Sequence, residues 1–289
     1  MNFINDLKNN ILKTLKRYYS NLYYYYLILK HVNNLILEIQ VCDHCNLNCR
    51  GCSHYSPLFN PTYIDIKNLK KDLLALKSIT PRFKEVRILG GEPFLNENLG
   101  QILLLIKNTF YRSKIIIVTN GILINKISGN LWNLIRENNI IIGISEYPIS
   151  LNYDKIYKIL DDHGIRYEIY RKRNENKWYI FQLNEKGDNN RYINFKRCGN
   201  DRSCWQLRDS RIYSCPTAAY SQILNQNFGT QFKVCKSDYI DLNRKISLIN
   251  LLVFLLKSKN FCRYCNIPRA EINWSKSSLK QNEWIIDKC

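Results

Sequence analysis

The sequence predicts an α/β fold: an open, partial (βα)6-type barrel followed by a small cysteine-rich α+β extension. Between residues 35 and 183, short apolar segments alternate with amphipathic segments of helical period. The connections between them are short, which is typical of a parallel sheet with helices outside. Only five or six such units can be counted, too few for a closed eight-unit barrel, so an open barrel is expected.

The elements can be followed in order from Leu35. Short strands are predicted over residues 35–41, 85–89, 114–118, 140–145, 166–170 and 178–183. Helices, which show apolar residues three and four positions apart, are predicted over residues 66–79, 99–110, 131–138 and 153–162. Gly164 suits the end of the last of these helices, because glycine readily takes the left-handed conformation found there.

The pattern breaks near Asn174, and most of the remaining cysteines follow. We place a domain boundary near residue 184, with a core over residues 35–183 and a cysteine-rich domain over residues 184–289 that contains a helix at 246–258. No Gly/Ser-rich linker separates them, so direct packing is expected. Residues 1–34 form an amphipathic basic helix, which could lie on an anionic membrane surface. We favour docking on the protein itself or on a partner.

The chain of 289 residues has 43 Lys and Arg against 24 Asp and Glu, a net charge of +19. Such a balance attracts nucleic acid, anionic lipid or acidic substrates. Lys, Asn, Ile and Tyr are all abundant, however, as an AT-rich genome would produce, and there is no arginine-rich block or nucleic-acid module. Nucleic acid is therefore not expected as a partner, and a phosphorylated substrate is the minority interpretation.

Eleven cysteines are many for this length. The N-terminus has no secretory signal, and the early apolar stretch at 22–29 is too short to span a bilayer. A cytoplasmic location is therefore expected, where clustered cysteines are metal ligands more often than disulfides.

Cys45, Cys49 and Cys52 stand in the run CDHCNLNCRGC, directly after the first predicted strand. Three thiolates on one tight loop would leave one iron of a cubane cluster without a protein ligand. A zinc site that adds Cys42 is the structural alternative. The second predicted strand then ends in the sequence GGEP, which comprises Gly90, Gly91, Glu92 and Pro93.

Together, these two stretches resemble the radical S-adenosylmethionine (SAM) enzymes. The resemblance implies a [4Fe-4S] cluster on Cys45, Cys49 and Cys52, chelation of its open iron by SAM, and reductive cleavage of SAM to a 5′-deoxyadenosyl radical that abstracts hydrogen from a substrate. This chain departs from the family at Gly51, where an aromatic residue is usual. The missing ring packing would come from His54 or Tyr55.

The resemblance also implies which residues contact SAM. Gly90 and Gly91 would allow close backbone approach to the ligand, and Glu92 would accept a hydrogen bond from its ammonium group. Polar residues at later strand ends complete the predicted cofactor site, with alternative interpretations as turn or surface residues: Asn120, Ser145 and Glu168.

A second set of cysteines follows the core. Cys204 and Cys215 flank a predicted turn, and Cys262 and Cys265 form a CxxC pair. This arrangement resembles the Twitch and SPASM extensions of radical SAM enzymes, which implies an auxiliary [4Fe-4S] cluster. Cys198 is an alternative to Cys204, tetrahedral zinc is an alternative to the cluster, and the glycine usual in the hairpin is absent.

The predicted function is thus radical chemistry on a small molecule, such as a sugar or nucleotide-sugar, with flavodoxin or ferredoxin as the electron donor. Two alternatives stay open at this point. One is a radical SAM maturase of peptides or proteins. The other, from a different class, is a non-catalytic zinc-binding protein that binds nucleic acid.

Overall fold

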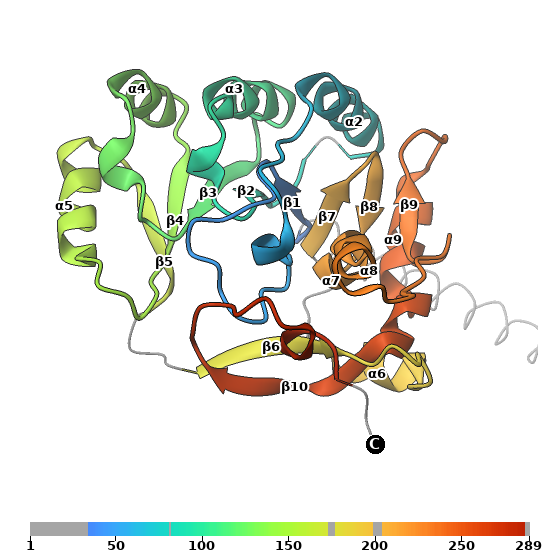
Figure 1. Ribbon diagram of the computed structural model, residues 1–289. Coiled ribbons are helices and arrows are strands. Elements are labelled where there is room, and N and C mark those ends of the chain that lie inside the picture. Colours follow the sequence, from blue (N-terminus) through green and yellow to red (C-terminus); the bar gives the residue numbers. More distant parts are fainter. Residues whose placement is uncertain (1–33, 81, 173–176, 199–203, 287–289) are drawn as a thin grey trace, which may run out of the picture.

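The computed structural model describes residues 34–80, 82–172, 177–198 and 204–286, and the Cys204 side chain is outside this description (Figure 1). The helix predicted over residues 1–34, with its membrane contact, lies outside the described residues except for Asn34. In the described part of the chain, no helix combines the length and apolar character needed to cross a membrane.

The main sheet has eight strands in the order β5-β4-β3-β2-β1-β7-β8-β9. The strands from β5 to β7 are all parallel to their neighbours, and the last two pairs are antiparallel. The prediction of an α/β fold with a mostly parallel sheet is confirmed. The strands are β1 (Ile36–Gln40), β2 (Glu85–Leu89), β3 (Lys114–Thr119), β4 (Ile141–Ser145), β5 (Tyr167–Arg171), β7 (Cys204–Arg208), β8 (Arg211–Tyr213) and β9 (Tyr239–Asp241).

Four helices cover one side of this sheet, as Figure 1 shows. They are α2 (Ile66–Ile79), α3 (Leu99–Thr109), α4 (Gly129–Glu137) and α5 (Tyr153–Asp162). The residues that precede α2, α4 and α5 are Asp65, Ser128 and Asn152, and the side chain of each accepts a hydrogen bond from a backbone N–H in the first turn of its helix. Gly164 follows α5 with a φ of 65°, as the sequence predicts.

The two faces of β1 differ because successive side chains of a strand point to opposite sides. Leu37, Ile39 and Val41 are fully buried in the core under the helices. Glu38 and Gln40 lie on the other face, where Glu38 accepts a hydrogen bond from Gln206 of β7. The inner face of the open barrel is therefore polar, whereas the face beneath the helices is apolar.

The segment predicted as a further strand at 178–183 is a strand, but it does not join the main sheet. β6 (Lys177–Leu183) pairs antiparallel with β10 (Cys265–Asn273) in a separate two-stranded sheet. The next strand of the main sheet after β5 in the sequence is instead β7. It pairs in parallel with β1, at the opposite end of the row of parallel strands from β5. Strands from both sides of the predicted boundary near residue 184 therefore share each of the two sheets.

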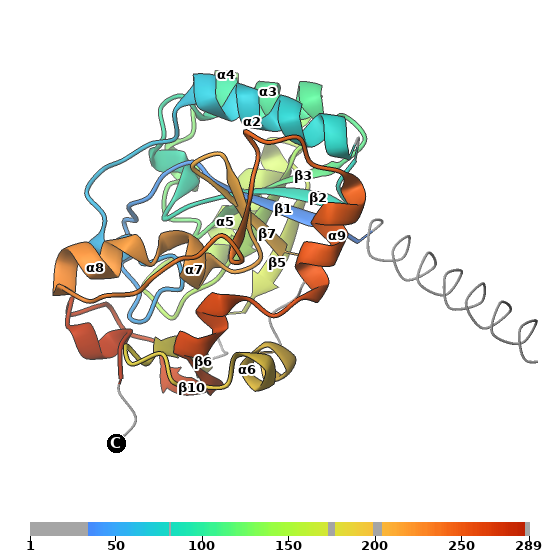
Figure 2. The same ribbon diagram turned by 90° about the vertical axis from the view of Figure 1, so that its right-hand side faces the viewer.

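Four helices belong to the second half of the chain, namely α6 (Arg191–Arg197), α7 (Pro216–Tyr220), α8 (Gln222–Phe228) and α9 (Leu248–Leu256). In Figures 1 and 2 the β6–β10 sheet and α6 form a layer on the side of the main sheet away from α2, α3 and α4. The loop after β1 descends toward this layer. Functional side chains from the first and the second half of the chain can therefore meet between the main sheet and the β6–β10 sheet.

Candidate functional site

The site is built around the loop that follows β1, which we call the Cys loop (residues 42–55). It leaves the carboxyl end of β1 and lies against the carboxyl ends of β2 and β3. A cavity of about 230 Å³ opens there. Seven predicted site residues line it, namely Cys45, Cys49, Cys52, Gly90, Gly91, Asn120 and Ser145. The structure thus brings together residues that are up to 100 positions apart in the sequence.

The two glycines of GGEP bring the Cys loop close to β2. A Cβ on Gly90 would stand 2.2 Å from the Cys42 carbonyl oxygen, and one on Gly91 would stand 1.9 Å from that of His44. The Gly91 N–H donates to Cys42 O at 2.7 Å. The close approach that glycine permits here is therefore to the loop backbone, so any larger residue would displace the loop.

Gly51 has a structural reason to be glycine. Its φ of +64° disfavours other residues, and a Cβ there would stand 2.5 Å from Cγ2 of Ile180. Ile180 belongs to β6, so the second sheet packs directly against the Cys loop at Gly51, the position where radical SAM enzymes usually have an aromatic residue. Tyr55, one of the two residues proposed to replace that ring, is fully buried and packs edge-on to Trp284.

A segment near the C-terminal end of the described residues lies alongside the Cys loop; we call residues 274–286 the tail. Arg50 N donates to Ser275 O at 2.9 Å and Ser277 N donates to Asn48 O at 2.7 Å. Cys49 and Lys276 form an antiparallel bridge between them. These contacts attach the tail to the backbone that presents the thiols.

Two of the three thiols of the Cys loop, Cys45 and Cys49, are in an environment that disfavours bare thiolates. Burial raises the pKa of Cys45 and of Cys49 to about 12, and repulsion from Cys52 adds to the rise of both. Burial also opposes ionisation of Cys52, but the hydrogen bond and charge of His54 outweigh it and lower the pKa of that thiol. Three sulfur ligands gathered on one loop favour a positively charged iron partner, which stabilises their thiolate forms.

Several N–H groups point at these sulfur atoms. The indole Nε1 of Trp274 donates to Cys49 Sγ at 3.2 Å, and Leu47 N donates to Cys45 Sγ at 3.4 Å. Asn120 Nδ2 lies 3.8 Å from Cys45 Sγ and donates to Asn46 Oδ1 at 2.8 Å. Such donors stabilise negative charge on sulfur, which is how proteins adjust iron–sulfur centres.

Glu92 is fully buried and does not line the cavity. Its carboxylate accepts from Thr119 Oγ1 at 2.8 Å, from Asn120 N at 3.1 Å and from Phe94 N at 3.2 Å. Burial raises its pKa to about 7, and these three donors offset part of that rise. Glu92 therefore ties the end of β2 to the end of β3. Pro93, which is buried as well, begins the short helical turn after it.

Glu168 is not brought to this cavity. Its carboxylate pairs with Lys114 Nζ at 2.6 Å. Lys114 is the first residue of β3, whereas the cavity lies at the opposite end of that strand, near Thr119 and Asn120. The carboxylate of Glu168 is therefore engaged near the amino end of the sheet, away from the three thiols.

The cavity has further lining residues that the sequence did not single out for the site. Two are aromatic: Tyr147, just after β4, and Trp178, in β6, whose rings are 5.5 Å apart. Tyr147 also packs near Trp274 of the tail, with ring centroids 6.0 Å apart. The motif Glu146-Tyr147-Pro148 at a strand end was the available signal for Tyr147; Trp178 has none, because β6 reaches the cavity only through its pairing with β10.

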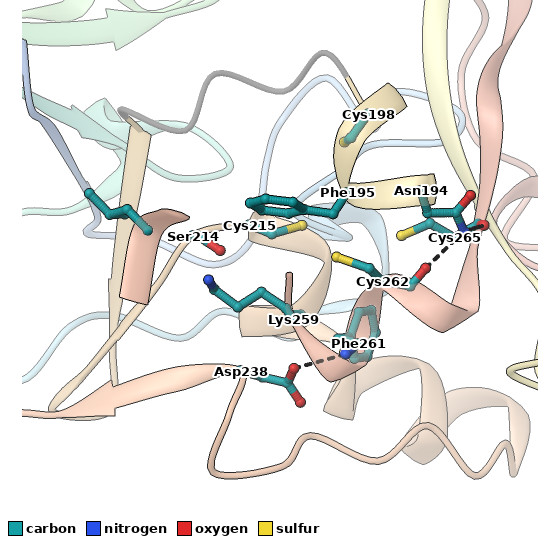
Figure 3. A pocket seen from close by; sticks show the side chains of 12 residues that line it. Asn194, Phe195, Cys198, Ser214, Cys215, Asp238, Lys259, Phe261, Cys262 and Cys265 are labelled. Atoms are coloured by element: carbon teal, nitrogen blue, oxygen red, sulfur yellow. Dashed lines mark hydrogen bonds between the residues drawn. The ribbon is translucent and has the colours of Figure 1, made fainter. Parts of the chain in front are cut away.

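The second set of cysteines surrounds another cavity. Cys198, Cys215, Cys262 and Cys265 all line it, and the sulfur atoms of the last three point toward one another (Figure 3). Cys198 ends α6, Cys215 precedes α7, and the CxxC pair leads into β10. Cys204 is the first residue of β7 and is paired with Ile36. The structure thus brings Cys198 to three of the four predicted cysteines.

Burial and mutual repulsion define the electrostatics of this second cavity. Burial raises the pKa of Cys262 to about 12 and that of Cys265 well above its usual range, and the neighbouring thiols raise both further. The Asn194 amide donates to Cys262 O at 2.9 Å and to Cys265 O at 2.6 Å, which orients the CxxC turn. Among the described residues, no three His, Cys, Asp or Glu side chains are grouped closely enough for one metal ion.

Residues 39–169 match the family model described as the radical SAM superfamily, so this part of the chain is a radical SAM superfamily domain. It spans β1 to β5 with the Cys loop and the GGEP turn, and membership implies a [4Fe-4S] cluster and SAM.

Curated relatives match the same region. GTP 3′,8-cyclase of Helicobacter pylori is 26% identical over 134 residues, which are 45% of this chain and 39% of the cyclase. GTP 3′,8-cyclase of Syntrophomonas wolfei is 30% identical over 123 residues, 37% of each chain. The chain therefore spans about two fifths of the length of these relatives.

One solved structure extends the similarity of fold to the second half of the chain. The structure of BtrN in complex with AdoMet and 2-DOIA matches 88% of this chain and 98% of that one, with a TM-score of 0.52 and 15% identity. Streptococcus suis SuiB bound to S-adenosylmethionine covers 50% of this chain and 37% of its own, with a TM-score of 0.40 and 21% identity.

Proposed function

We propose that this protein is a radical SAM enzyme that abstracts a hydrogen atom from a small-molecule substrate. The observation on which the proposal rests is the meeting of three thiols, one buried and two half-buried, with the GGEP turn and the ends of β3 and β4 around one cavity. The donor set fits an iron–sulfur cluster, because the three thiols are soft ligands on one loop.

In this proposal the chain's residues have distinct tasks. Cys45, Cys49 and Cys52 would hold a [4Fe-4S] cluster, and SAM would lie in the cavity beside Asn120 and Ser145. When bound, the cluster and SAM supply the 5′-deoxyadenosyl radical. Glu92 positions Asn120 through the bond to its backbone N–H. Gly90, Gly91 and Pro93 shape the turn that keeps the Cys loop against β2.

Aromatic side chains would exclude water from this space. Tyr147 packs against Trp178 and against Trp274, which come from separate segments, and Trp274 donates to Cys49 Sγ. Oxygen adds to carbon radicals and destroys exposed clusters, so an apolar wall that restricts access to the site is a functional requirement. The same sensitivity makes a reducing compartment, the cytoplasm, the location that we propose.

We also propose an auxiliary [4Fe-4S] cluster in the second cavity. Cys215, Cys262 and Cys265 would be three of its ligands, and Cys198 would be the fourth because it lines the same cavity. Cys204, the fourth ligand predicted from the sequence, remains the alternative. A radical SAM core over residues 35–183 and an auxiliary-cluster domain over residues 184–289 remain our proposed division of the chain, after the N-terminal segment 1–34.

A small, anionic substrate is the class that the observations favour. BtrN, whose fold matches nearly the whole chain, holds AdoMet and 2-DOIA together in its complex. The cyclases that match the core are named for GTP, a nucleotide. The net charge of +19 suits a phosphorylated molecule such as a nucleotide-sugar. With fully ligated auxiliary iron, oxidation of the substrate is the outcome that we favour.

The test is anaerobic reconstitution followed by incubation with SAM and a strong reductant. We expect about eight iron atoms per chain, since two cubane clusters contain four each, and release of 5′-deoxyadenosine even without substrate. Replacing Cys45, Cys49 and Cys52 together by Ala should abolish that release and leave about half of the iron. A colourless protein with bound zinc that is inert toward SAM would contradict the proposal and favour the zinc-binding, nucleic-acid-binding class.

Substrate class can be tested separately. Nucleotide-sugars and short peptides are offered to the reconstituted enzyme, and deuterium transfer from labelled substrate into 5′-deoxyadenosine is measured by mass spectrometry. Transfer from a peptide but from no small molecule would overturn the substrate proposal in favour of a peptide or protein maturase, and would leave the radical SAM assignment intact.

A further inference from the structure

Three exposed cationic residues lie on the outer side of the Cys loop and the tail. Arg50, Lys276 and Lys280 line a surface pocket of about 360 Å³ together with polar residues of the tail. Leu279 stands between Ser278 and Lys280 and is 54% exposed. We call Arg50, Lys276, Leu279 and Lys280 the tail patch. It is an exposed, basic patch that includes one apolar residue, and none of its members lines the cavity of the three thiols.

The tail patch is attached to the backbone that presents the proposed cluster ligands. Arg50 stands between Cys49 and Cys52 in the sequence, and its N–H donates to Ser275 O at 2.9 Å. Lys276 forms an antiparallel bridge with Cys49. A protein bound to this patch would therefore lie directly over the Cys loop.

The positive charge of the patch is only partly balanced locally. Burial opposes ionisation of Glu283, but the charge of Arg50 helps to lower the pKa of that carboxyl, whereas the two lysines of the patch have no carboxylate of their own among the described pocket-lining residues. Among the described residues that line the pocket, Glu283 is the single carboxylate, and it is buried. Its oxygens accept from the hydroxyls of Ser277 and Ser278 at 2.5 and 2.7 Å and from Ser278 N at 2.7 Å. The carboxylate thus organises the turn of the tail, and the cations are left facing solvent.

Leu279 is in an unusual conformation for an exposed apolar residue. Its φ is 58°, in the left-handed region that a bulky residue rarely adopts. The turn that imposes it is held by the bond from Leu279 N to Ser277 Oγ at 3.0 Å and by the bonds to Glu283. The structure therefore keeps an exposed leucine directly before Lys280 in the chain. Exposed apolar and cationic side chains on one surface segment are a combination found in protein–protein interfaces.

We infer that the tail patch is the docking surface for an acidic one-electron donor protein of the flavodoxin type. The inference rests on the proposed function, which requires an electron to reach the cluster on Cys45, Cys49 and Cys52. In each transfer the reduced flavin of the donor loses one electron and the oxidised cluster gains one, and no bond is made or broken between the proteins. The lysines and Arg50 attract the acidic surface, and Leu279 supplies the apolar contact.

The test compares two reductants on the same reconstituted protein. One is flavodoxin kept reduced by NADPH and its reductase, and the other is reduced methyl viologen, a small cation that needs no acidic docking site. The variant Lys276→Glu with Lys280→Glu reverses two charges of the patch. The control variant, Lys67→Glu with Lys70→Glu, makes the same change on the exposed side of α2. Substrate-independent release of 5′-deoxyadenosine is measured, together with flavodoxin binding by calorimetry at two salt concentrations.

We expect the patch variant to lose at least about tenfold in flavodoxin-supported rate at low donor concentration, within the range of electrostatic steering, and to bind flavodoxin more weakly. Its rate with methyl viologen should equal that of wild type, as should both rates of the control variant. Leu279→Gly, which suits the left-handed backbone, should weaken binding without reducing the methyl viologen rate.

Two outcomes would overturn the inference. One is a wild-type protein that gains no activity from flavodoxin, and the other is equal flavodoxin dependence in the patch and control variants. Failure of the wild type with methyl viologen is a different result, because it contradicts the proposed function itself. The inference would then also fall, since no cluster would need an electron.

Discussion

The indole N–H of Trp274 donates to the Cys49 thiol across 225 positions of sequence, with 3.2 Å between nitrogen and sulfur. Trp274 belongs to the tail and Cys49 to the Cys loop after β1. The bond is reinforced by backbone pairing on both sides of Cys49, from Asn48 to Ser277 and from Arg50 to Ser275. The second half of the chain thus contributes directly to the surroundings of the proposed SAM-binding cluster.

Replacing Trp274 by Phe should therefore make that cluster harder to reduce. The change keeps an aromatic ring but removes the hydrogen bond, and hydrogen bonds to sulfur raise the reduction potential of iron–sulfur centres. We expect a shift on the order of tens of millivolts to more negative values, since a hydrogen bond to a charged group contributes about 1.5–3 kcal/mol. Potentiometric titration followed by electron paramagnetic resonance measures it. Trp178→Phe is the matched control, and an unchanged potential in Trp274→Phe would contradict the prediction.

Single substitutions decide between the two candidates for the fourth auxiliary ligand. Cys198→Ser should reduce the iron content by about half and remove one of two cluster signals, because a cubane that loses a thiolate ligand is labile. Cys204→Ser should retain both clusters. Iron analysis and Mössbauer spectroscopy of the two purified variants provide the comparison. The reverse pattern would assign the ligand to Cys204.

Asn194 should be needed for the auxiliary cluster although it is not a ligand. Its side-chain amide binds the carbonyl oxygens of Cys262 and Cys265, and the apolar variant Asn194→Leu leaves both without that donor. We expect loss of auxiliary-cluster iron with the first cluster intact, measured by iron content and by 5′-deoxyadenosine release. Asn138→Leu, which removes a similar amide bond to Leu134 O in α4, is the control. Full iron content in Asn194→Leu would show that the CxxC turn forms unaided.

Glu92 should make stability depend on pH. Its pKa is raised from 4.5 to about 7 in the folded protein, so the folded state binds a proton that the unfolded state releases. The free energy of unfolding should therefore fall as pH rises from about 4.5 to about 7, by roughly 3 kcal/mol in total. Glu92→Gln removes this dependence. Denaturant unfolding of both proteins at pH 5 and pH 7.5 measures the difference.

The pH dependence of the free energy of unfolding separates the titration of Glu92 from the mere loss of its hydrogen bonds. Glu92→Gln also deprives one of its three donors of an acceptor, which should cost about 1–3 kcal/mol at every pH. A constant penalty with no pH dependence would mean that Glu92 is ionised in the folded state throughout. A penalty that shrinks as pH rises is the expected result.

Local patterns were sufficient to predict most of the core. The helix at 66–79 and the strand at 85–89 have the predicted bounds, because a buried face repeats at 3.6 residues in one and alternates in the other. The thiol loop, the GGEP turn, Asn120 and Ser145 meet as expected, since each follows a strand whose carboxyl end lies on one edge of a parallel sheet. Because consecutive strands lie side by side in parallel, the residues that gather at that edge can be predicted from the sequence.

Long-range pairing was not predictable in the same way. Strand β6 has a strand's composition, but its partner β10 lies about 90 residues away, and no local pattern specifies that choice. The contacts of Trp274, Trp178 and Cys198 all depend on this second sheet and its helix α6. Glu168 was expected at the cofactor because it lies in the fifth strand, but its ion pair with Lys114 engages it near the opposite end of β3.

The bridge between Cys49 and Lys276 has a consequence for how the protein matures. Contacts between distant parts of a chain pay the largest loop-closure entropy and form slowly. We therefore expect the tail to dock on the Cys loop late in folding, so that the loop stays uncovered until then. In that interval iron and sulfide would have access to the three thiols, and the docked tail would afterwards cover the proposed cluster.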